Sequence, residues 1–517
     1  MSYKVIDLFA GPGGLGEGFA SLNGGKAFEI VVSAEMEESA HKTLTLRSYF
    51  RHAKRGQDRN ALSAYYDFCH SSSAPHPKDV APDLWAKATS EARQLTLGSQ
   101  AGNEELDKII AAAKLSSDKT VVIGGPPCQA YSLVGRARNL GKANYKAEDD
   151  HRHFLYKEYL RILQKVSPAV FVMENVKGIL SSKVNNKLVF HDILRDLSNP
   201  SIATQSGDGP EYVIHSLVTD TAFSYGMDPE SIDPRDFIIY SERYGIPQAR
   251  HRVILLGIRK SELGGKSFAR LSRADHTVTL EQALFNLPKL RSKLGRSDSA
   301  STWAKTVSDL SVRLAQEARD AGELQMATAL SNLKSRFSDE LGTGGLRIPH
   351  TQPAENSQNR YSEWVTDTQL DVWLNHETRS HMTSDLGRYL FASTFADTFE
   401  RSPKGHTDFA LPSLAPAHAN WESGKFADRF KVQLYTRPST TVTSHISKDG
   451  HYFIHPDPSQ CRSLTVREAA RLQTFPDNYF FQGNRTQQFH QVGNAVPSLL
   501  ANQIATICND LLASRKK

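Results

Sequence analysis

The sequence is poor in cysteine and has no long apolar run. Only four of its 517 residues are cysteines, Cys69, Cys128, Cys461 and Cys508, and no two have C-x-x-C spacing. This usage argues against a disulfide framework or a metal site and favours a reducing compartment. No apolar stretch approaches the roughly 20 residues that a membrane span needs. The chain opens on a strand-like run rather than a signal peptide, so we expect a cytoplasmic protein without membrane contact.

The charge of the chain is mildly basic. The formal net charge is +6 and the isoelectric point is about 8.9. Such an excess is compatible with a polyanionic partner but does not establish one. The length predicts two or three domains. Because the four cysteines are too scattered to form a framework, a single well-placed one becomes a candidate nucleophile.

Short apolar runs alternate with helical stretches in the first half of the chain. The runs lie at 5–9, 28–34, 120–123, 169–173, 212–218 and 253–257. This alternation predicts βαβ units and a mostly parallel sheet. Residues from about 50 to 117 break the rhythm and are interpreted as an insertion. Residues 262–460 do not continue it; within them 298–340 is expected to be helical, and Asp449-Gly450 to turn a β-hairpin.

A glycine-rich turn follows the first predicted strand. Gly11, Gly13 and Gly16 form a G-x-G-x-x-G pattern, which lets a backbone approach a ligand at the start of a helix. Glu35 ends the next strand, where a carboxylate can hold the ribose hydroxyls of an adenosine. The loop alone fits a nicotinamide dehydrogenase as well as a methyltransferase.

A cysteine follows two prolines at the end of another predicted strand. The prolines before Cys128 stiffen the chain and present the thiol at the carboxyl edge of the sheet, where open α/β folds bind ligands. Glu174 ends the neighbouring strand and should lie at the same edge. Arg250 and Arg252 alternate in an extended segment, so both can point to one side. Together these residues predict a functional site at this edge, with Cys128 as a candidate nucleophile.

These motifs resemble those of the DNA (cytosine-5) methyltransferases, and in particular the prokaryotic modification enzymes. Six segments match in the family's order, and they run nearly from end to end of the chain: Asp7–Gly14, Gly125–Gln129, Glu174–Val176, Gln248–Arg252, Arg462–Pro476 and Gln491–Pro497. Ala130-Tyr131 departs from the small residue and phenylalanine usual in the cysteine loop. The acidic residue that usually contacts the adenine ring cannot be placed.

The resemblance implies a Rossmann-like sheet that binds S-adenosylmethionine, with a separate, smaller target-recognition domain. The expected boundaries are 1–261 for the catalytic domain, 262–485 for the recognition domain and 486–517 for a segment that returns to the catalytic domain. The catalytic residues that it implies are Cys128, Glu174, Arg250 and Arg252. The implied cofactor-binding residues are Phe9, Gly11, Pro12, Gly13, Gly14, Leu15, Glu35, Met36, Pro126, Asn494 and Val496.

The resemblance also implies a mechanism and partners. Cys128 would add to C6 of cytosine, Glu174 would engage N3 and the exocyclic amine, and Arg252 would contact O2, while Arg250 would hold the loop or a phosphate. The target base would be flipped out of duplex DNA. Basic and polar side chains of 262–460, such as Lys431, Arg437 and His445, could reach phosphates or base edges. A monomer near the nucleoid is expected, in a restriction-modification or other defence system, with a cognate endonuclease or other defence proteins as possible partners.

Three alternatives remain open at this level. An RNA cytosine-C5 methyltransferase would share the motifs, but the Cys-Phe-Thr tripeptide typical of one tRNA-modifying branch is absent. A silent DNA-binding regulator on the same fold would not need Cys128, Glu174 and Arg252. A nicotinamide dehydrogenase explains the glycine loop but not Pro-Pro-Cys-Gln or Gly493-Asn494.

Overall fold

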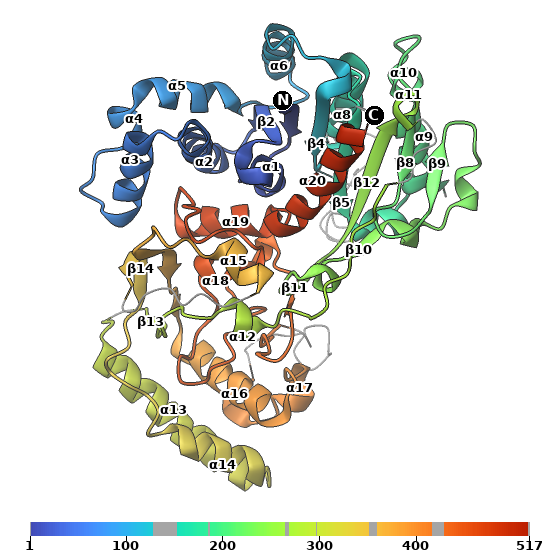
Figure 1. Ribbon diagram of the computed structural model, residues 1–517. Coiled ribbons are helices and arrows are strands. Elements are labelled where there is room, and N and C mark those ends of the chain that lie inside the picture. Colours follow the sequence, from blue (N-terminus) through green and yellow to red (C-terminus); the bar gives the residue numbers. More distant parts are fainter. Residues whose placement is uncertain are drawn as a thin grey trace.

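The computed structural model describes residues 2–127, 152–184, 187–263, 268–295, 297–350, 359–415 and 429–514. Cys128 therefore lies outside the described residues. Within the described ranges, no helix has both the length and the apolar character to cross a bilayer. The molecule has an upper part built around one large sheet and a lower, mainly helical part (Figure 1).

A nine-stranded sheet organises the upper part. In spatial order its path is β3-β2-β1-β4-β5-β12-β8-β9, and β10 pairs with β12. The bounds are β1 (Tyr3–Leu8), β2 (Phe28–Glu35), β3 (Ala92–Gln94), β4 (Thr120–Gly124), β5 (Val170–Val176), β8 (Tyr212–His215), β9 (Ala222–Ser224), β10 (Ile238–Tyr240) and β12 (His251–Arg259). The predicted α/β class is confirmed, and the apolar runs of the sequence become its central strands.

The expectation of a mostly parallel sheet is correct for only one half of the sheet, from β3 to β5. Strands β1 to β5 pair in parallel, whereas β12 runs antiparallel to both β5 and β8. The β8–β9 and β10–β12 pairs are antiparallel as well. An apolar run indicates a buried strand but not its direction, which depends on the connection that precedes it.

Helices cover both faces of the sheet (Figure 1). The bounds on one face are α1 (Gly14–Ala20) and α20 (Ser498–Ala513), and those on the other are α6 (Gln100–Ala112), α8 (Arg152–Val166) and α9 (Val189–Ser198). Gly18 lets α1 and α20 approach closely, because a Cβ at that position would lie 2.4 Å from the Cβ of Ala501. The C-terminal helix therefore packs directly on the helix that follows the glycine loop.

The segment interpreted as an insertion contributes to the sheet itself. Four helices, α2 (Glu38–Gly56), α3 (Arg59–His70), α4 (Pro77–Val80) and α5 (Pro82–Glu91), lead into the edge strand β3, and α6 then returns to β4. Residues 92–112 thus belong to the βαβ framework, and the interpretation of all of 50–117 as an insertion is corrected. The signal was weak because β3 has only three residues, Ala92-Arg-Gln94, and no apolar run.

The lower part combines helices with short strand pairs. Its elements are α12 (Leu280–Ala283), α13 (Ala300–Asp320), α14 (Leu324–Leu333), β14 (Gly344–Pro349), α15 (Arg360–Val365), β15 (Val372–Glu377), α16 (Thr383–Phe399), β17 (Ser439–Thr440), α18 (Val466–Leu472) and α19 (Arg485–Asn494). Helices α13 and α14 confirm the helical stretch expected at 298–340 and share a core with α16. The expected hairpin at Asp449-Gly450 is wrong: Gly450 turns with φ +78, but a short 3-10 helix (Ser444–Ser447) precedes it, and Ile454 forms only isolated bridges.

Candidate active site

The glycine loop joins β1 to α1 at the carboxyl edge of the sheet. Gly11 (φ +59) and Gly13 (φ +99) have left-handed backbone conformations, which disfavour side chains. A Cβ on Gly11 would meet no atom within 4 Å, so open space lies beside the loop at that point. The loop thus offers the close backbone approach that a nucleotide-like ligand requires.

Glu35 binds this loop from the end of β2. Its Oε2 accepts a hydrogen bond from the Gly11 amide at 2.8 Å, and its Oε1 accepts one from the Glu37 amide at 2.8 Å. Burial raises the pKa of the Glu35 carboxyl, while these backbone donors oppose the shift. The apolar side chains nearby in sequence are Phe9, which is partly exposed, and Met36, which is 60% exposed. A carboxylate and two accessible apolar groups therefore stand at one end of the loop.

The last sequence motif, Gln491–Pro497, packs against the residue that follows the glycine loop. A Cβ on Gly14 would lie 2.2 Å from the backbone oxygen of Val496, so only glycine permits this contact. Asn494 is exposed, and its amide nitrogen lies 3.2 Å from Nδ1 of His490. Residues near the two ends of the chain thus meet beside this loop.

Glu174 and Arg252 form an ion pair at the ends of two strands beyond β4. Glu174 lies in β5 and Arg252 in β12, and Oε1 of the carboxylate is 3.0 Å from Nε of the guanidinium. Both side chains are mostly buried. Burial lowers the pKa of Arg252, and the carboxylate opposes this change. The pair places a carboxylate and a cation together at the carboxyl end of β5.

The chain that leads to the cysteine lies beside this pair. A Cβ on Gly125 would be 3.1 Å from Oε2 of Glu174, and the amide of Asn175 donates to the backbone oxygen of Pro126 at 3.4 Å. Strand β4, which precedes the prolines, pairs with both β1 and β5. The described residues just before Cys128 therefore lie between the glycine loop and the Glu174–Arg252 pair.

Arg250 has different neighbours from Arg252. Its side chain is buried, and Nη1 donates to the backbone oxygens of Val442 at 2.8 Å and Gly493 at 3.3 Å. Burial and the nearby Arg252 charge lower its pKa. The adjoining strand β11 (Gln248–Ala249) pairs with β17, so this segment is joined to the chain that returns from the lower part.

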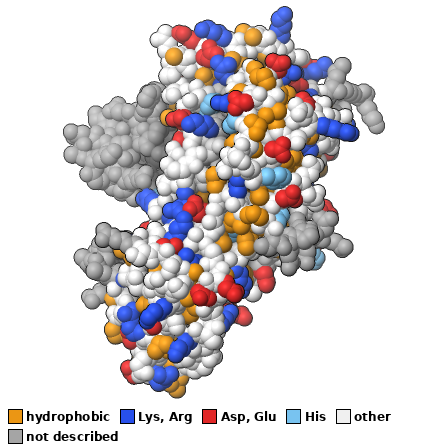
Figure 2. Space-filling view, turned by 90° about the vertical axis from the view of Figure 1, so that its left-hand side faces the viewer, with side chains coloured by type: hydrophobic (Ala, Val, Ile, Leu, Met, Phe, Trp, Pro, Cys, Tyr) orange, Lys and Arg blue, Asp and Glu red, His pale blue; other side chains and the backbone are white. Residues whose placement is uncertain are grey.

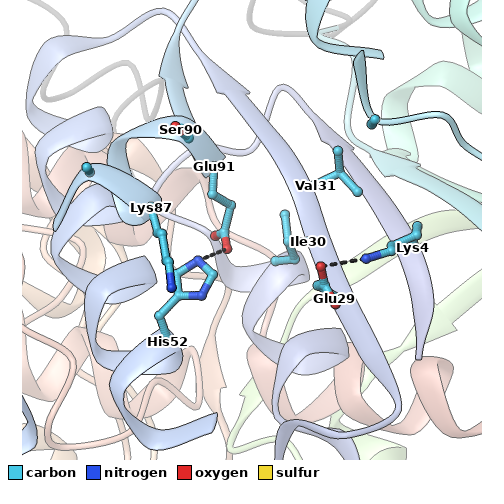
Figure 3. A pocket seen from close by; sticks show the side chains of 10 residues that line it. Lys4, Glu29, Ile30, Val31, His52, Lys87, Ser90 and Glu91 are labelled. Atoms are coloured by element: carbon cyan, nitrogen blue, oxygen red, sulfur yellow. Dashed lines mark hydrogen bonds and ion pairs between the residues drawn. The ribbon is translucent and has the colours of Figure 1, made fainter. Parts of the chain in front are cut away.

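A cavity of about 470 Å³ lies elsewhere, between β1, β2 and the helices α2 and α5 (Figure 3). It is lined by Lys4, Glu29, His52 and Glu91 among others, and it contains the Lys4–Glu29 and His52–Glu91 pairs. None of the residues predicted from the sequence lines it. Its position gives it no part in the candidate site.

The sequence motifs do not include the tyrosine that contacts the glycine loop, Tyr479. Tyr479 is fully buried, and its hydroxyl donates to the backbone oxygen of Pro12 at 2.5 Å. The two residues are 467 positions apart in the sequence. An aromatic residue after Phe475-Pro-Asp-Asn478 gives no local sign of such a contact.

The chain is similar to several known proteins. A family model described as C-5 cytosine-specific DNA methylase matches residues 83–200 and 236–509. The chain is 32% identical over 528 residues to the type II methyltransferase M.Bpa9945I of Bacillus paralicheniformis, covering 98% of this chain and 99% of the relative. It is 26% identical over 522 residues to the type II methyltransferase M.AgeI of Thalassovita gelatinovora, covering 97% and 98%.

A solved structure shares the fold. It is that of a prophage-encoded protein of E. coli, assigned as a DNA modification methyltransferase. The TM-score is 0.53 at 19% sequence identity, and the match covers 99% of each chain. At this identity the likeness concerns the fold alone.

Proposed function

This chain belongs to the C-5 cytosine-specific DNA methylases, and we propose that the carboxyl edge of its sheet binds S-adenosylmethionine beside a flipped cytosine. The reaction is methylation of DNA at cytosine C5. The observation that supports this site best is the Glu174–Arg252 pair, which lies next to Gly125. Glu174 is in β5, and only β4 separates β5 from β1, the strand that leads into the glycine loop.

The glycine loop and its surroundings fit the cofactor. The open space beside Gly11 and the free lone pairs of Glu35 suit the ribose of an adenosine, and Phe9 and Met36 offer apolar contact to its ring. The remaining residues proposed for this half are Pro12, Gly13, Gly14, Leu15, Pro126, Asn494 and Val496. Bound S-adenosylmethionine would supply an electrophilic methyl group.

Cys128, Glu174 and Arg252 would activate the base. The Cys128 thiolate forms a bond to C6, and the electron pair of the C5–C6 double bond moves into the ring, which makes C5 nucleophilic. Glu174 holds a proton at N3 and accepts from the exocyclic amine, so that charge entering the ring is neutralised. Arg252 donates to O2. At the end of the reaction a base removes the C5 proton and the C6–S bond breaks.

Arg250 would act on the frame of the site rather than on the base. Its guanidinium already donates to the backbone of Val442 and Gly493. This position supports a role in holding the returning chain and the last motif against the sheet. The phosphate contact expected as an alternative would require the side chain to leave its buried position.

The lower part would read the DNA sequence. Figure 2 shows Lys and Arg side chains gathered at mid-height, between the upper part and the end formed by α13 and α14. Such a cluster suits the DNA backbone. Arg437 is exposed and belongs to the turn just before β17, beside the arginine motif. Base readout would then be separate from base chemistry.

The biological setting follows from the relatives. The relatives M.Bpa9945I and M.AgeI are named type II methyltransferases, and enzymes of this type act in restriction-modification systems. We infer a cognate restriction endonuclease or another defence component as the functional partner, and action as a monomer on DNA in the prokaryotic cytoplasm at the nucleoid. Methylation would protect host DNA at the sequence that the endonuclease cuts.

Expression in a host without cytosine methylation tests this proposal. Bisulfite sequencing of the host DNA should reveal cytosines protected within one short sequence, and a Cys128→Ala variant should leave none. Methyl transfer from tritiated S-adenosylmethionine should favour duplex DNA over tRNA. Transfer to tRNA alone would support the RNA enzyme instead. DNA binding without any transfer would support the silent regulator.

A further inference from the structure

Tyr479 joins the glycine loop to the lower part of the molecule. Its side chain is fully buried, and burial raises the pKa of its hydroxyl, which stays a proton donor at neutral pH. The hydroxyl donates to the backbone oxygen of Pro12 at 2.5 Å. Pro12 lies between Gly11 and Gly13, which both have positive φ. The hydrogen bond therefore acts on the backbone between these two glycines.

The loop and the tyrosine fit each other closely. A Cβ at Gly13 would lie 2.9 Å from the Tyr479 hydroxyl and 2.7 Å from the side chain of Leu44. The Arg47 guanidinium lies 4.7 Å from the centre of the Tyr479 ring and forms an ion pair with Glu17 of α1 at 2.5 Å. The ring thus packs against Arg47 of α2, which is itself paired with α1, so its hydroxyl has little freedom to move.

The backbone of Tyr479 is fixed to strand β15 in the lower part. Arg467 donates to the backbone oxygen of Tyr479 at 2.7 Å and to that of Leu374 at 2.8 Å. The Asn375 side chain forms two hydrogen bonds, each of 3.0 Å, with the backbone of Phe481. These contacts make Tyr479 a rigid connection between β15 and the glycine loop.

We propose that Tyr479 is a positioning residue that holds the glycine loop in the shape that binds the cofactor. The inference rests on the proposed function of this loop. A glycine-rich loop has few side-chain contacts and many accessible conformations. If the ligand binds only one of these conformations, its apparent affinity falls in proportion to the population of that conformation. The Tyr479 hydroxyl removes much of that freedom before the ligand arrives.

The substitution Tyr479→Phe removes the hydroxyl and keeps the ring. Calorimetric titration with S-adenosylhomocysteine should show a dissociation constant raised about 5-fold, the size expected from one net hydrogen bond. The affinity for duplex DNA and kcat at saturating S-adenosylmethionine should stay within a factor of about two. A raised KM for the cofactor with an unchanged kcat separates positioning from catalysis.

Tyr212→Phe is the matched control. Tyr212 is equally buried, and its hydroxyl also donates to a proline backbone oxygen, that of Pro168 at 3.1 Å, at the opposite edge of the sheet. Both variants should lose similar amounts of thermal stability, but only Tyr479→Phe should bind the cofactor product more weakly. The comparison of the two variants remains decisive if both are destabilised. The affinity for S-adenosylhomocysteine is measured at a temperature at which both variants are folded.

The outcomes are distinguishable. If the unmodified protein binds no S-adenosylhomocysteine, the proposed function of the loop fails. If it binds and Tyr479→Phe binds equally well, the positioning role is wrong. An equal loss of cofactor affinity in Tyr212→Phe, or an equal loss of DNA affinity in Tyr479→Phe, would show a general effect on structure and would also overturn the inference.

Discussion

Arg250 and Arg252 lie two residues apart, yet their guanidinium groups have different partners. Arg252 pairs with Glu174, while Arg250 is buried against backbone oxygens of Val442 and Gly493. The alternation of an extended segment places such residues on one side. Here the alternation is interrupted, because β11 ends at Ala249 and β12 begins at His251. One arginine thus pairs with the carboxylate of the proposed reaction site, and the other is buried in the frame around it.

Substitutions should separate these two roles. Arg250→Ala leaves two buried backbone oxygens without a donor and should lower the free energy of unfolding by about 3 kcal/mol. Arg252→Lys keeps the charge beside Glu174 and should change stability by less than about 1 kcal/mol, but it should lower kcat at least about 10-fold. Urea unfolding and single-turnover methylation measure the two effects. A stable but inactive Arg250→Ala would place that residue in the chemistry.

Glu174→Gln should reduce turnover with little loss of cofactor affinity. The amide is nearly isosteric but cannot hold a proton for N3, so single-turnover rates should fall by about 100-fold or more. Titration with S-adenosylhomocysteine should give a dissociation constant close to that of the unmodified protein. If that affinity collapses while the rate per bound complex is maintained, Glu174 has a structural role.

We expect Asp7 to make the free energy of unfolding depend on pH. The carboxyl is completely buried in β1, and burial raises its pKa to about 8. Because the folded protein keeps a proton that the unfolded chain loses near pH 4, this group lowers stability as pH rises from about 4 to 8, and no further above that. Asp7→Asn should therefore be increasingly more stable than the unmodified protein over this range, by up to about 5 kcal/mol at pH 8.

Thermal unfolding of both proteins between pH 5 and 9 measures this difference. A constant gap in melting temperature across the range would show that Asp7 does not titrate there.

At the scale of elements, local sequence patterns predict the central strands of the sheet but not the antiparallel direction of β12. Alternating runs predicted the central strands, and strand ends predicted that Glu174, Glu35 and the glycine loop share one edge. Strand β3 was missed because its three residues, Ala92-Arg-Gln94, have no apolar pattern. The contact between Tyr479 and Pro12 was missed for another reason: a hydrogen bond between distant backbone and side-chain groups leaves no periodic signal.

The structure refines how the recognition elements could be exchanged. Ser439 and Val442 are hydrogen-bonded to Pro247 and Gln248, so the end of the segment 262–460 belongs to the frame of the active site. Exchange of 293–430 with a relative of different specificity, with strand β15 kept because it holds Tyr479 in place, should keep activity and change the methylated sequence. Exchange of 293–460 should lower activity at least about 10-fold, because these contacts are replaced as well.

Methylation patterns from bisulfite sequencing, with in vitro rates, decide between the two chimeras. An active 293–430 chimera that methylates the original sequence would place readout outside this segment.

At the scale of the whole molecule, three of its four thiols are unsuited to covalent chemistry. Cys69, Cys461 and Cys508 are buried, and burial raises the pKa of each thiol, that of Cys69 to about 12. A thiol held protonated and away from solvent is a poor nucleophile. The remaining cysteine, Cys128, follows the described residues that lie between the glycine loop and the Glu174–Arg252 pair. Cys128 is thus the thiol that we propose as the nucleophile.

DNA carrying 5-fluorocytosine at the target position tests this claim most directly. Cys128 can add to C6 and C5 can be methylated, but the step that frees the enzyme requires loss of the C5 substituent as a cation, which fluorine cannot undergo. We expect a thioether adduct that survives denaturing electrophoresis, forms only with S-adenosylmethionine and maps by mass spectrometry to the peptide containing Cys128. An adduct on Cys69, Cys461 or Cys508, or none on DNA that the protein otherwise methylates, would contradict the account.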